Sequence, residues 1–236
     1  MIKLFTAQQI KEWDNYTILN EPISSLDLME RASFTFVEWY QKHHKHDKTI
    51  YIFCGPGNNG GDGFAISRLL LEKGYQVRPF LISKSLKKLS IDCKINYKKI
   101  KHHIQIIDDL ESIESLTILE NSIIIDALFG IGLSRPLEGI YKLLVNQLNL
   151  TSNYKISVDI PSGMYCDRLN NINDRIFKTN KIISFQTPKR AFFLKENNIY
   201  YSSYTVLDIG LSKEFYELTK SEWHLNEQNL VQKRHL

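Results

Sequence analysis

Cysteine is scarce in this sequence, with three residues in 236, at positions 54, 93 and 166. No two of them form a CxxC pair, and an odd, scattered set argues against a disulfide framework. The chain also lacks any run of 18 apolar residues, and its N-terminus lacks the apolar segment and cleavage site of a secretory signal. These absences argue against a membrane protein and predict a reduced, soluble protein of the cytoplasm.

A strong charge bias is missing as well, because 30 Lys and Arg residues face 26 Asp and Glu residues, for a net charge of +4. Much of the lysine excess lies in residues 84–101, which carry no aromatic platform for stacking bases. We interpret this run as a solvated helix face and expect no nucleic-acid partner. Hydrophobic residues make up 43% of the chain, which is enough for the core of an ordinary globular protein.

Apolar, β-rich runs alternate with helical segments along most of the chain. Two capping boxes open the first two helices, Thr6 with Gln9 and Ser24 with Asp27. Continuous apolar strands separated by helices predict an α/β fold with a parallel sheet covered on both faces, in one domain over residues 1–236. Within it, residues 220–236 match no known pattern and form an uncertain tail. We expect strands at 49–54, 75–82, 104–107, 122–128, 155–160, 181–185 and 204–209, and helices at about 7–19, 25–43, 64–73, 91–101 and 137–148.

Three of the predicted strands end in polar or glycine-rich sequence. These ends are GPGNNGGDG at Gly55–Gly63, Asp126 with GIGLSRP at 130–136, and Asp159 with the PSG segment at 161–163. In an open parallel sheet, ligands bind outside the carboxyl ends of the strands. The three segments should therefore meet at one rim, where we expect the functional site.

The segment Gly55–Gly63 holds five glycines in nine residues. Glycine lets a ligand approach the backbone closely, and amide groups at the start of the following helix would bind an anion. The segment is not a Walker A motif, because no GK[ST] follows, and it does not match the GxGxxG fingerprint. A tight strand-to-helix turn is the plainer alternative, which explains two or three glycines but not Asn58, Asn59 and Asp62 between them.

Asp126 and Asp159 each end an apolar strand, where a carboxylate needs a cation or hydrogen-bond donors. Arg135 could pair with a phosphate through two hydrogen bonds, and an ordinary surface arginine is the alternative. Asn and Ser oxygens near the two carboxylates suggest a hard cation, and this weakly anionic set suits a monovalent ion. The sequence around Ser162 does not match GxSxG, so we do not expect a hydrolase triad.

These motifs resemble those of the YjeF N-terminal domain family, the NAD(P)H-hydrate epimerases. The resemblance runs through most of the chain and rests above all on GPGNNGGDG followed later by DIPSG. The sequence departs from the family at Ser33, where glycine is usual, and at Ser83, where a lysine often stands and Lys84 follows one residue later. The matching residues are Leu28–Ala32, Gly55–Gly63, Asp126, Phe129–Leu133, Val158–Gly163, Pro188-Lys189 and Val206–Gly210.

The resemblance implies a Rossmann-like three-layer αβα sandwich with a mainly parallel sheet, a homodimer, and epimerisation of R- and S-NAD(P)HX at C6 of the nicotinamide ring in nucleotide repair. It also implies a bound potassium ion, held by Asn59, Asp126 and Ser162. We expect a stand-alone epimerase without a fused dehydratase domain, with a separate NAD(P)HX dehydratase as its functional partner. The residues expected to contact NADHX or NADPHX are Asn58, Asn59, Gly60, Gly61, Asp62, Gly130, Ile131, Gly132, Leu133, Ser134, Arg135, Pro136 and Asp159.

The implied reaction suggests which residues would act. C6 of the hydrated ring carries a hydroxyl beside the ring nitrogen, and loss of that hydroxyl gives an iminium to which water returns on either face. A proton donor, a proton acceptor and nearby carboxylates would assist, with Asp159 as our first choice and Asp126 as the second. Two alternatives stay open. One is a non-catalytic nucleotide-binding or scaffolding module on the same fold, and the other is an NAD-dependent oxidoreductase, which needs a cleaner dinucleotide fingerprint.

Overall fold

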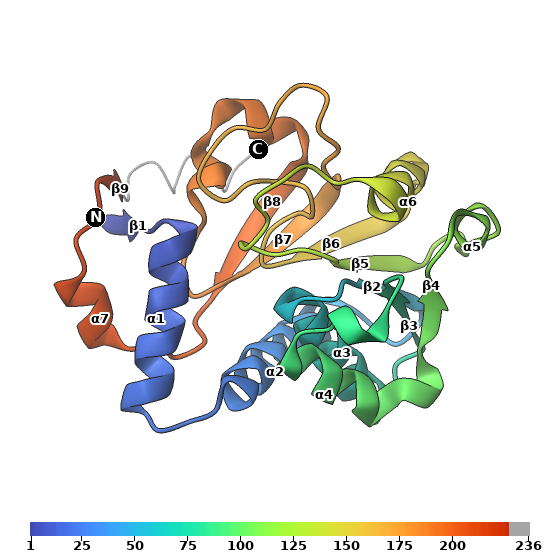
Figure 1. Cartoon of the computed structure of the whole chain (residues 1–236), viewed down its shortest axis with the longest axis horizontal. Helices are drawn as coiled ribbons and strands as arrows, with labels where there is room; N and C mark the ends of the chain where they lie inside the picture. The colour runs from blue at the N-terminus through green and yellow to red at the C-terminus, as the bar shows by residue number, and fades with distance from the viewer. Residues whose placement is uncertain (227–236) are drawn as a thin grey trace.

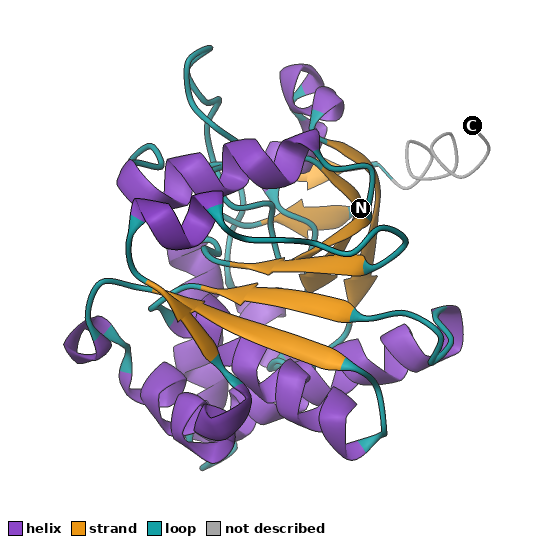
Figure 2. Cartoon of the chain, turned by 90° about the vertical axis from the view of Figure 1, so that its right-hand side faces the viewer, coloured by secondary structure: helices purple, strands orange, loops and turns teal. Residues whose placement is uncertain are grey.

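Seven parallel strands form the central sheet of the protein, whose computed structural model describes residues 1–226. The strand order is β4-β3-β2-β5-β6-β7-β8, so the direction of winding switches between β2 and β5. Helices cover both faces (Figures 1 and 2), which confirms the predicted αβα sandwich. The strands are β2 (Ile50–Cys54), β3 (Val77–Ile82), β4 (Gln105–Ile107), β5 (Ile123–Ala127), β6 (Tyr154–Val158), β7 (Thr179–Phe185) and β8 (Tyr201–Leu207).

The two predicted capping boxes are present at the first two helices. The backbone amides of Gln9 and Asp27 donate to the hydroxyls of Thr6 and Ser24, each at 3.1 Å.

Among residues 1–226, no helix is both long enough and apolar enough to cross a membrane. The helices are α1 (Ala7–Asn20), α2 (Ser25–His43), α3 (Asn58–Glu72), α4 (Ile91–Ile100), α5 (Leu110–Glu114), α6 (Gly139–Leu150) and α7 (Lys213–Leu218), with 3₁₀ helices at Leu86–Lys88, Lys101–His103, Arg190–Phe193 and Lys195–Ile199.

Alternate residues of each central strand pack into two hydrophobic cores, one on each face of the sheet. On β2, Ile50 and Ile52 join the core that includes residues of α1 to α4. Tyr51 and Phe53 point the other way and join the core that includes residues of α5 and α6. Burial on both faces is the reason these strands appear in the sequence as continuous apolar runs.

Helix α3 begins at Asn58, six residues before the predicted start at residue 64. The glycine-rich segment is therefore largely the first turns of a helix, and our expectation of a loop there was wrong. Glycine disfavours helix in isolation, but packing overrides that preference here. A Cβ on Gly60 would lie 1.8 Å from the carbonyl oxygen of Gly55, so only glycine lets α3 pack this closely against the turn after β2.

The two ends of the described chain meet in a second sheet, which is antiparallel and has two strands. It pairs β1 (Ile2–Leu4) with β9 (Trp223–Leu225), a pairing that the sequence analysis did not predict. Part of the predicted tail thus belongs to an ordered element, and residues 227–236 lie outside the described residues.

Helix α1 packs against α7 and forms hydrogen bonds with Ser212, the residue just before α7. The ring of Trp13 stacks on that of Phe215, with 6.1 Å between centroids, and its Nε1 donates to the carbonyl oxygen of Ser212 at 2.7 Å. The amide of Ser212 in turn donates to the hydroxyl of Thr17 at 3.0 Å. Because Trp13 and Thr17 are buried, these contacts fix the rotation of α1 about its axis.

Candidate functional site

A pocket of about 670 Å³ opens beside the switch in strand order between β2 and β5. Residues of α1, of the first turns of α3, and of the loops after β5, β6 and β7 line it. The structure therefore brings the three polar segments together, as their positions after the strands predicted. The expected ligand residues in the lining are Asn58, Asn59, Asp62, Gly130, Ile131, Gly132, Leu133, Ser134, Arg135 and Asp159.

Three of the expected ligand residues lie outside this lining. Gly60 faces Gly55, a Cβ on Gly61 would meet an α2 side chain at 2.8 Å, and Pro136 is exposed beyond the pocket. The amide of Gly61 donates to the carbonyl oxygen of Gly57 at 3.1 Å. Glycine at positions 60 and 61 therefore serves the packing of α3.

The N-terminus of α3 gives the pocket an anion-binding end. Gly57 is the N-cap residue and has no side chain to satisfy the first amides of the helix. Lys11 of α1 also lines the pocket, with Nζ 3.7 Å from the position that a Cβ on Gly132 would take. The exposed Arg135 adds a second cation to the lining. Free amides, the positive end of the helix dipole and two cations together suit a phosphate group.

Asp159 forms a buried ion pair with Lys189, with Oδ1 and Nζ 2.7 Å apart. Lys189 is 1% exposed and also donates to the carbonyl oxygens of Phe185 and Thr187, at 2.9 and 3.1 Å. The carboxylate accepts a further hydrogen bond from the amide of Phe185 at 3.0 Å. Its backbone has a φ of +65°, which is uncommon for a residue other than glycine. The Asp159 carboxylate is thus fixed at the pocket wall with its charge balanced.

Asp126 lies beneath the pocket and has no exposed surface. Its Oδ1 accepts from the Ser162 hydroxyl at 2.5 Å and the Leu128 amide at 3.2 Å, and its Oδ2 accepts from the Ser162 amide at 2.8 Å and the Ser157 hydroxyl at 3.1 Å. Burial raises the pKa of Asp126 to about 6, and these hydrogen bonds oppose the rise. Asp126 is not among the residues that line the pocket, and its acid–base role, our second choice, stays a prediction.

Two carboxylates that the sequence analysis missed, Asp14 of α1 and Asp92 of α4, also line the pocket. Burial raises the pKa of Asp14 to about 7, the charge of Asp159 adds to the rise, and Lys189 opposes it. Burial also raises the pKa of Asp62 well above its usual range, again with a contribution from Asp159. The pocket therefore holds carboxyl groups that bind protons more strongly than free ones do.

One sequence signal could have revealed Asp14. Asp14 lies four residues after Ile10 and four before Ile18, so the three share one face of the helix. All three residues line the pocket. A carboxylate on the apolar stripe of a helix is costly unless it has a role. Lys189 matches the family motif, but nothing in the sequence indicates its pairing with Asp159, because only the fold brings the two together.

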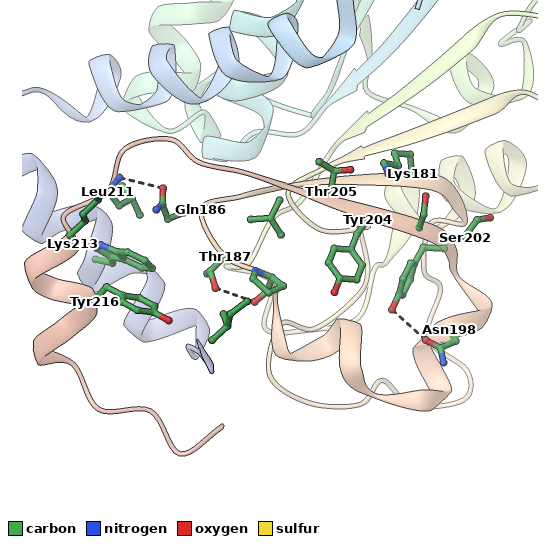
Figure 3. Close-up of a pocket in the computed structure, with 16 residues that line it drawn as sticks. Lys181, Gln186, Thr187, Asn198, Ser202, Tyr204, Thr205, Leu211, Lys213 and Tyr216 are labelled. Atoms are coloured by element: carbon green, nitrogen blue, oxygen red, sulfur yellow. Dashed lines mark hydrogen bonds between the residues drawn. The ribbon is translucent and has the colours of Figure 1, made fainter. Parts of the chain in front are cut away.

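A second and larger pocket, of about 1000 Å³, lies along β8 beside α7 (Figure 3). Tyr204, Tyr216, Lys181 and Lys213 are among the residues that line it. Its described lining contains no Asp or Glu and none of the expected ligand residues. We therefore assign the chemistry to the smaller pocket, where carboxylates, a buried ammonium and free amides converge.

Known proteins share this chain's sequence and fold. The family model described as YjeF-related protein N-terminus matches residues 25–191. An NAD(P)H-hydrate epimerase of Anaerococcus prevotii is 34% identical over 88% of this chain and 95% of its own length. A bifunctional NAD(P)H-hydrate repair enzyme Nnr of Thermofilum pendens is 40% identical over 70% of this chain and 32% of its own length. The crystal structure of the yeast protein ynu0 has a similar fold, with a TM-score of 0.73 and 22% identity over 95% of this chain and 96% of that one.

The matched regions contain the pocket described above. Residues 25–191 include the three polar segments and Lys189, whereas Asp14 precedes them. The A. prevotii relative extends the similarity to nearly its whole length. The chain therefore belongs to the family of YjeF-related protein N-termini.

Proposed function

We propose that this protein is an isomerase that interconverts the R and S epimers of NADHX and NADPHX, the hydrated forms of the reduced nicotinamide nucleotides. The observation that carries the proposal is the pocket itself, where the Asp159–Lys189 pair and the anion-binding end of α3 share one cavity. Family membership supports it, since relatives similar over most of this chain bear the name NAD(P)H-hydrate epimerase.

The two ends of the pocket suit the two ends of such a nucleotide. The pyrophosphate would bind the first amides of α3, with Lys11 and Arg135 beside it. The hydrated ring would lie toward Asp159, where a developing iminium charge is stabilised by a carboxylate. Loss of the C6 hydroxyl and return of water on the opposite face would then invert C6 without net consumption of the nucleotide.

The non-catalytic binding module is the competing function on this fold. It would need the phosphate end of the pocket but not a buried ion pair that holds a carboxylate in the wall. Burying the Lys189 ammonium to 1% exposure costs desolvation free energy, which is offset only when its partners are in place. The presence of Asp159 and Lys189 in this arrangement therefore favours the enzyme.

A clearance assay distinguishes the two functions. An NAD(P)HX dehydratase that accepts one epimer, supplied as a separate protein, should consume about half of a mixed R and S preparation quickly. Adding the present protein should let the same dehydratase clear the remainder at a rate that rises with the amount added. A remainder that decays only at the spontaneous rate would support the binding module instead.

We also propose that Asn59, Asp126 and Ser162 hold a potassium ion. The available donors are hard oxygens with one negative charge, which suits a monovalent cation. Asn59 is buried beside Gly130, and its amide nitrogen has no hydrogen-bond partner among the described residues. Turning this amide over would present its oxygen at that point, as a cation requires. Bound there, the ion would offset the cost of the buried Asp126 charge and order the loops that Ser162 joins.

Potassium binding should be visible without substrate. For a Kd on the order of 10 mM, about 100 mM KCl would stabilise the fold by about 1.4 kcal/mol, which is roughly 3–6 °C in Tm for a domain of this size. LiCl at equal ionic strength should give a clearly smaller rise. Asp126→Asn should abolish the difference between the salts, whereas Asp159→Asn should keep it. Equal responses to both salts in the wild-type protein would contradict the ion site.

The cytoplasmic location and the homodimer remain predictions, as does the division of labour with a separate dehydratase. The bifunctional relatives, whose printed names describe hydrate repair, support a functional link between epimerase and dehydratase activities. Light scattering of the purified protein at several concentrations would test the dimer directly.

A further inference from the structure

Asp14 has no structural role that would explain its position. Its carboxylate makes no hydrogen bond or ion pair within residues 1–226, and it caps no helix there. The contacts of Trp13 and Thr17 with Ser212 lock the helix on either side of it. Helix α1 therefore holds this side chain in the pocket lining, where its desolvation costs free energy. No hydrogen bond or ion pair within the described residues offsets that cost.

The charged groups around Asp14 come from several elements of the pocket. Asp159 and Lys189 are close enough to shift its pKa in opposite directions, and Asp14 in turn contributes to the raised pKa of Asp62. Lys11 lies one turn earlier on the same helix and lines the same pocket. Of the carboxylates that line the pocket within residues 1–226, Asp159 alone has a buried ammonium against it. The pocket therefore pairs a charge-balanced carboxylate with a second one that has no counter-ion of its own.

We infer that Asp14 is a second catalytic carboxyl group of this pocket, the one that protonates the departing C6 hydroxyl while Asp159 accepts the proton of the returning water. The inference rests on the proposed epimerase function and goes beyond it by dividing the two proton transfers between named residues. Two carboxyl groups in unlike environments are a recurrent solution to acid and base work in one site. Burial sets the pKa of Asp14 to about 7, so a protonated fraction is available at neutral pH.

The step balances without any further reactant. Asp14 gives its proton to the hydroxyl oxygen, the C6–O bond breaks with its electron pair leaving on water, and the lone pair of the ring nitrogen forms a C=N bond. Water then attacks the opposite face through an oxygen lone pair, and the C=N π pair returns to nitrogen. Asp159 takes the proton of that water, and exchange with solvent restores the proton to Asp14.

The first test measures stability against pH and needs no substrate. The pKa of Asp14 is raised from 3.8 to about 7, so its contribution to the stability of the wild-type fold is present at low pH, declines as pH rises from about 4, and is lost above about 7, where this half-buried group is ionised. Asp14→Asn removes the cost of this ionisation. We expect the variant to melt at a higher temperature than the wild type at pH 8, with an advantage that shrinks as pH falls and is gone at about pH 4. Glu12 is an exposed carboxylate on the same helix. Glu12→Gln should show no such pH-dependent difference in melting temperature from the wild type.

The second test is the pH profile of kcat/KM with a single epimer of NADHX. The wild-type profile should fall as pH rises through about 7. Asp14→Asn should lose roughly 100-fold or more in kcat and should lack this alkaline limb, while Kd for the nucleotide changes by less than about threefold. Glu12→Gln should match the wild type.

Three outcomes would overturn the inference. An Asp14→Asn variant that retains full activity and the alkaline limb would show that another group, such as Asp62, supplies the proton, and the epimerase function would still stand. A loss confined to Kd would make Asp14 a ligand contact. A wild-type protein without epimerase activity would remove the proposed function and this inference with it.

Discussion

Lys189→Met is expected to lower the Tm of this protein by roughly 6–20 °C. The substitution leaves the Asp159 carboxylate buried without its ammonium partner, and breaking a buried pair in this way costs about 3–5 kcal/mol. For a domain of this size each kcal/mol corresponds to about 2–4 °C. The hydrogen bonds that hold the carbonyl oxygens of Phe185 and Thr187 are lost at the same time. Thermal and denaturant unfolding of the purified variant measure the effect.

A double-mutant cycle separates the ion pair from ordinary packing. Asp159→Asn alone leaves the Lys189 charge buried, so it should be destabilising and should also lower kcat by roughly 100-fold or more. The double variant Asp159→Asn/Lys189→Met leaves no lone charge, and it should be more stable than the sum of the two single losses by about 1–3 kcal/mol. Its activity should stay low, because the carboxylate is gone. Single losses that simply add would contradict a direct coupling of the two residues.

Gly60→Ala is expected to prevent accumulation of folded protein. Its Cβ would lie 1.8 Å from the backbone oxygen of Gly55, so either α3 or the turn after β2 must move. We expect a loss of about 3 kcal/mol or more, at the upper end of overpacking effects. Gly57→Ala is the matched control on the same segment, because nothing lies within 4 Å of its Cβ position and its φ is −89°.

The two glycine variants should therefore fail in different ways. Gly57→Ala should fold with a Tm close to the wild type, and any defect should appear in nucleotide binding, because Gly57 lines the pocket. Circular dichroism melts and binding of NADH as an unhydrated probe would separate the two effects. Normal folding of Gly60→Ala would mean that α3 does not pack on Gly55 as described.

Much of the fold follows from local sequence patterns. The capping boxes at Thr6 and Ser24, and the apolar strands, predicted the elements and the parallel sheet, and the polar residues after each strand predicted where the pocket lies. Our predicted start of α3 was wrong because glycine disfavours helix in isolation. Here glycine allows Gly60 to pack closely on Gly55, and this contact exists only in the folded chain.

The chemistry of the pocket is less accessible to sequence patterns. Lys189 meets Asp159 only because β6 and β7 are neighbours in the sheet. Asp14 comes from a helix at the start of the chain that contacts the C-terminal helix α7, and the sequence gives no reason to place that helix over the rim. Asp126 illustrates the reverse problem, because a carboxylate after a strand can lie beneath the pocket as well as in its wall.

The central claim is that this pocket inverts C6 of a hydrated nicotinamide nucleotide. The most direct measurement starts from pure R-NADHX and follows its ¹H NMR signals, or its separation on a chiral column, with and without the purified protein. We predict that the R form relaxes to an equilibrium mixture with S at a rate proportional to protein concentration, with no loss of total NADHX, and that Asp159→Asn slows this by roughly 100-fold. An interconversion rate that does not depend on protein concentration would contradict the claim.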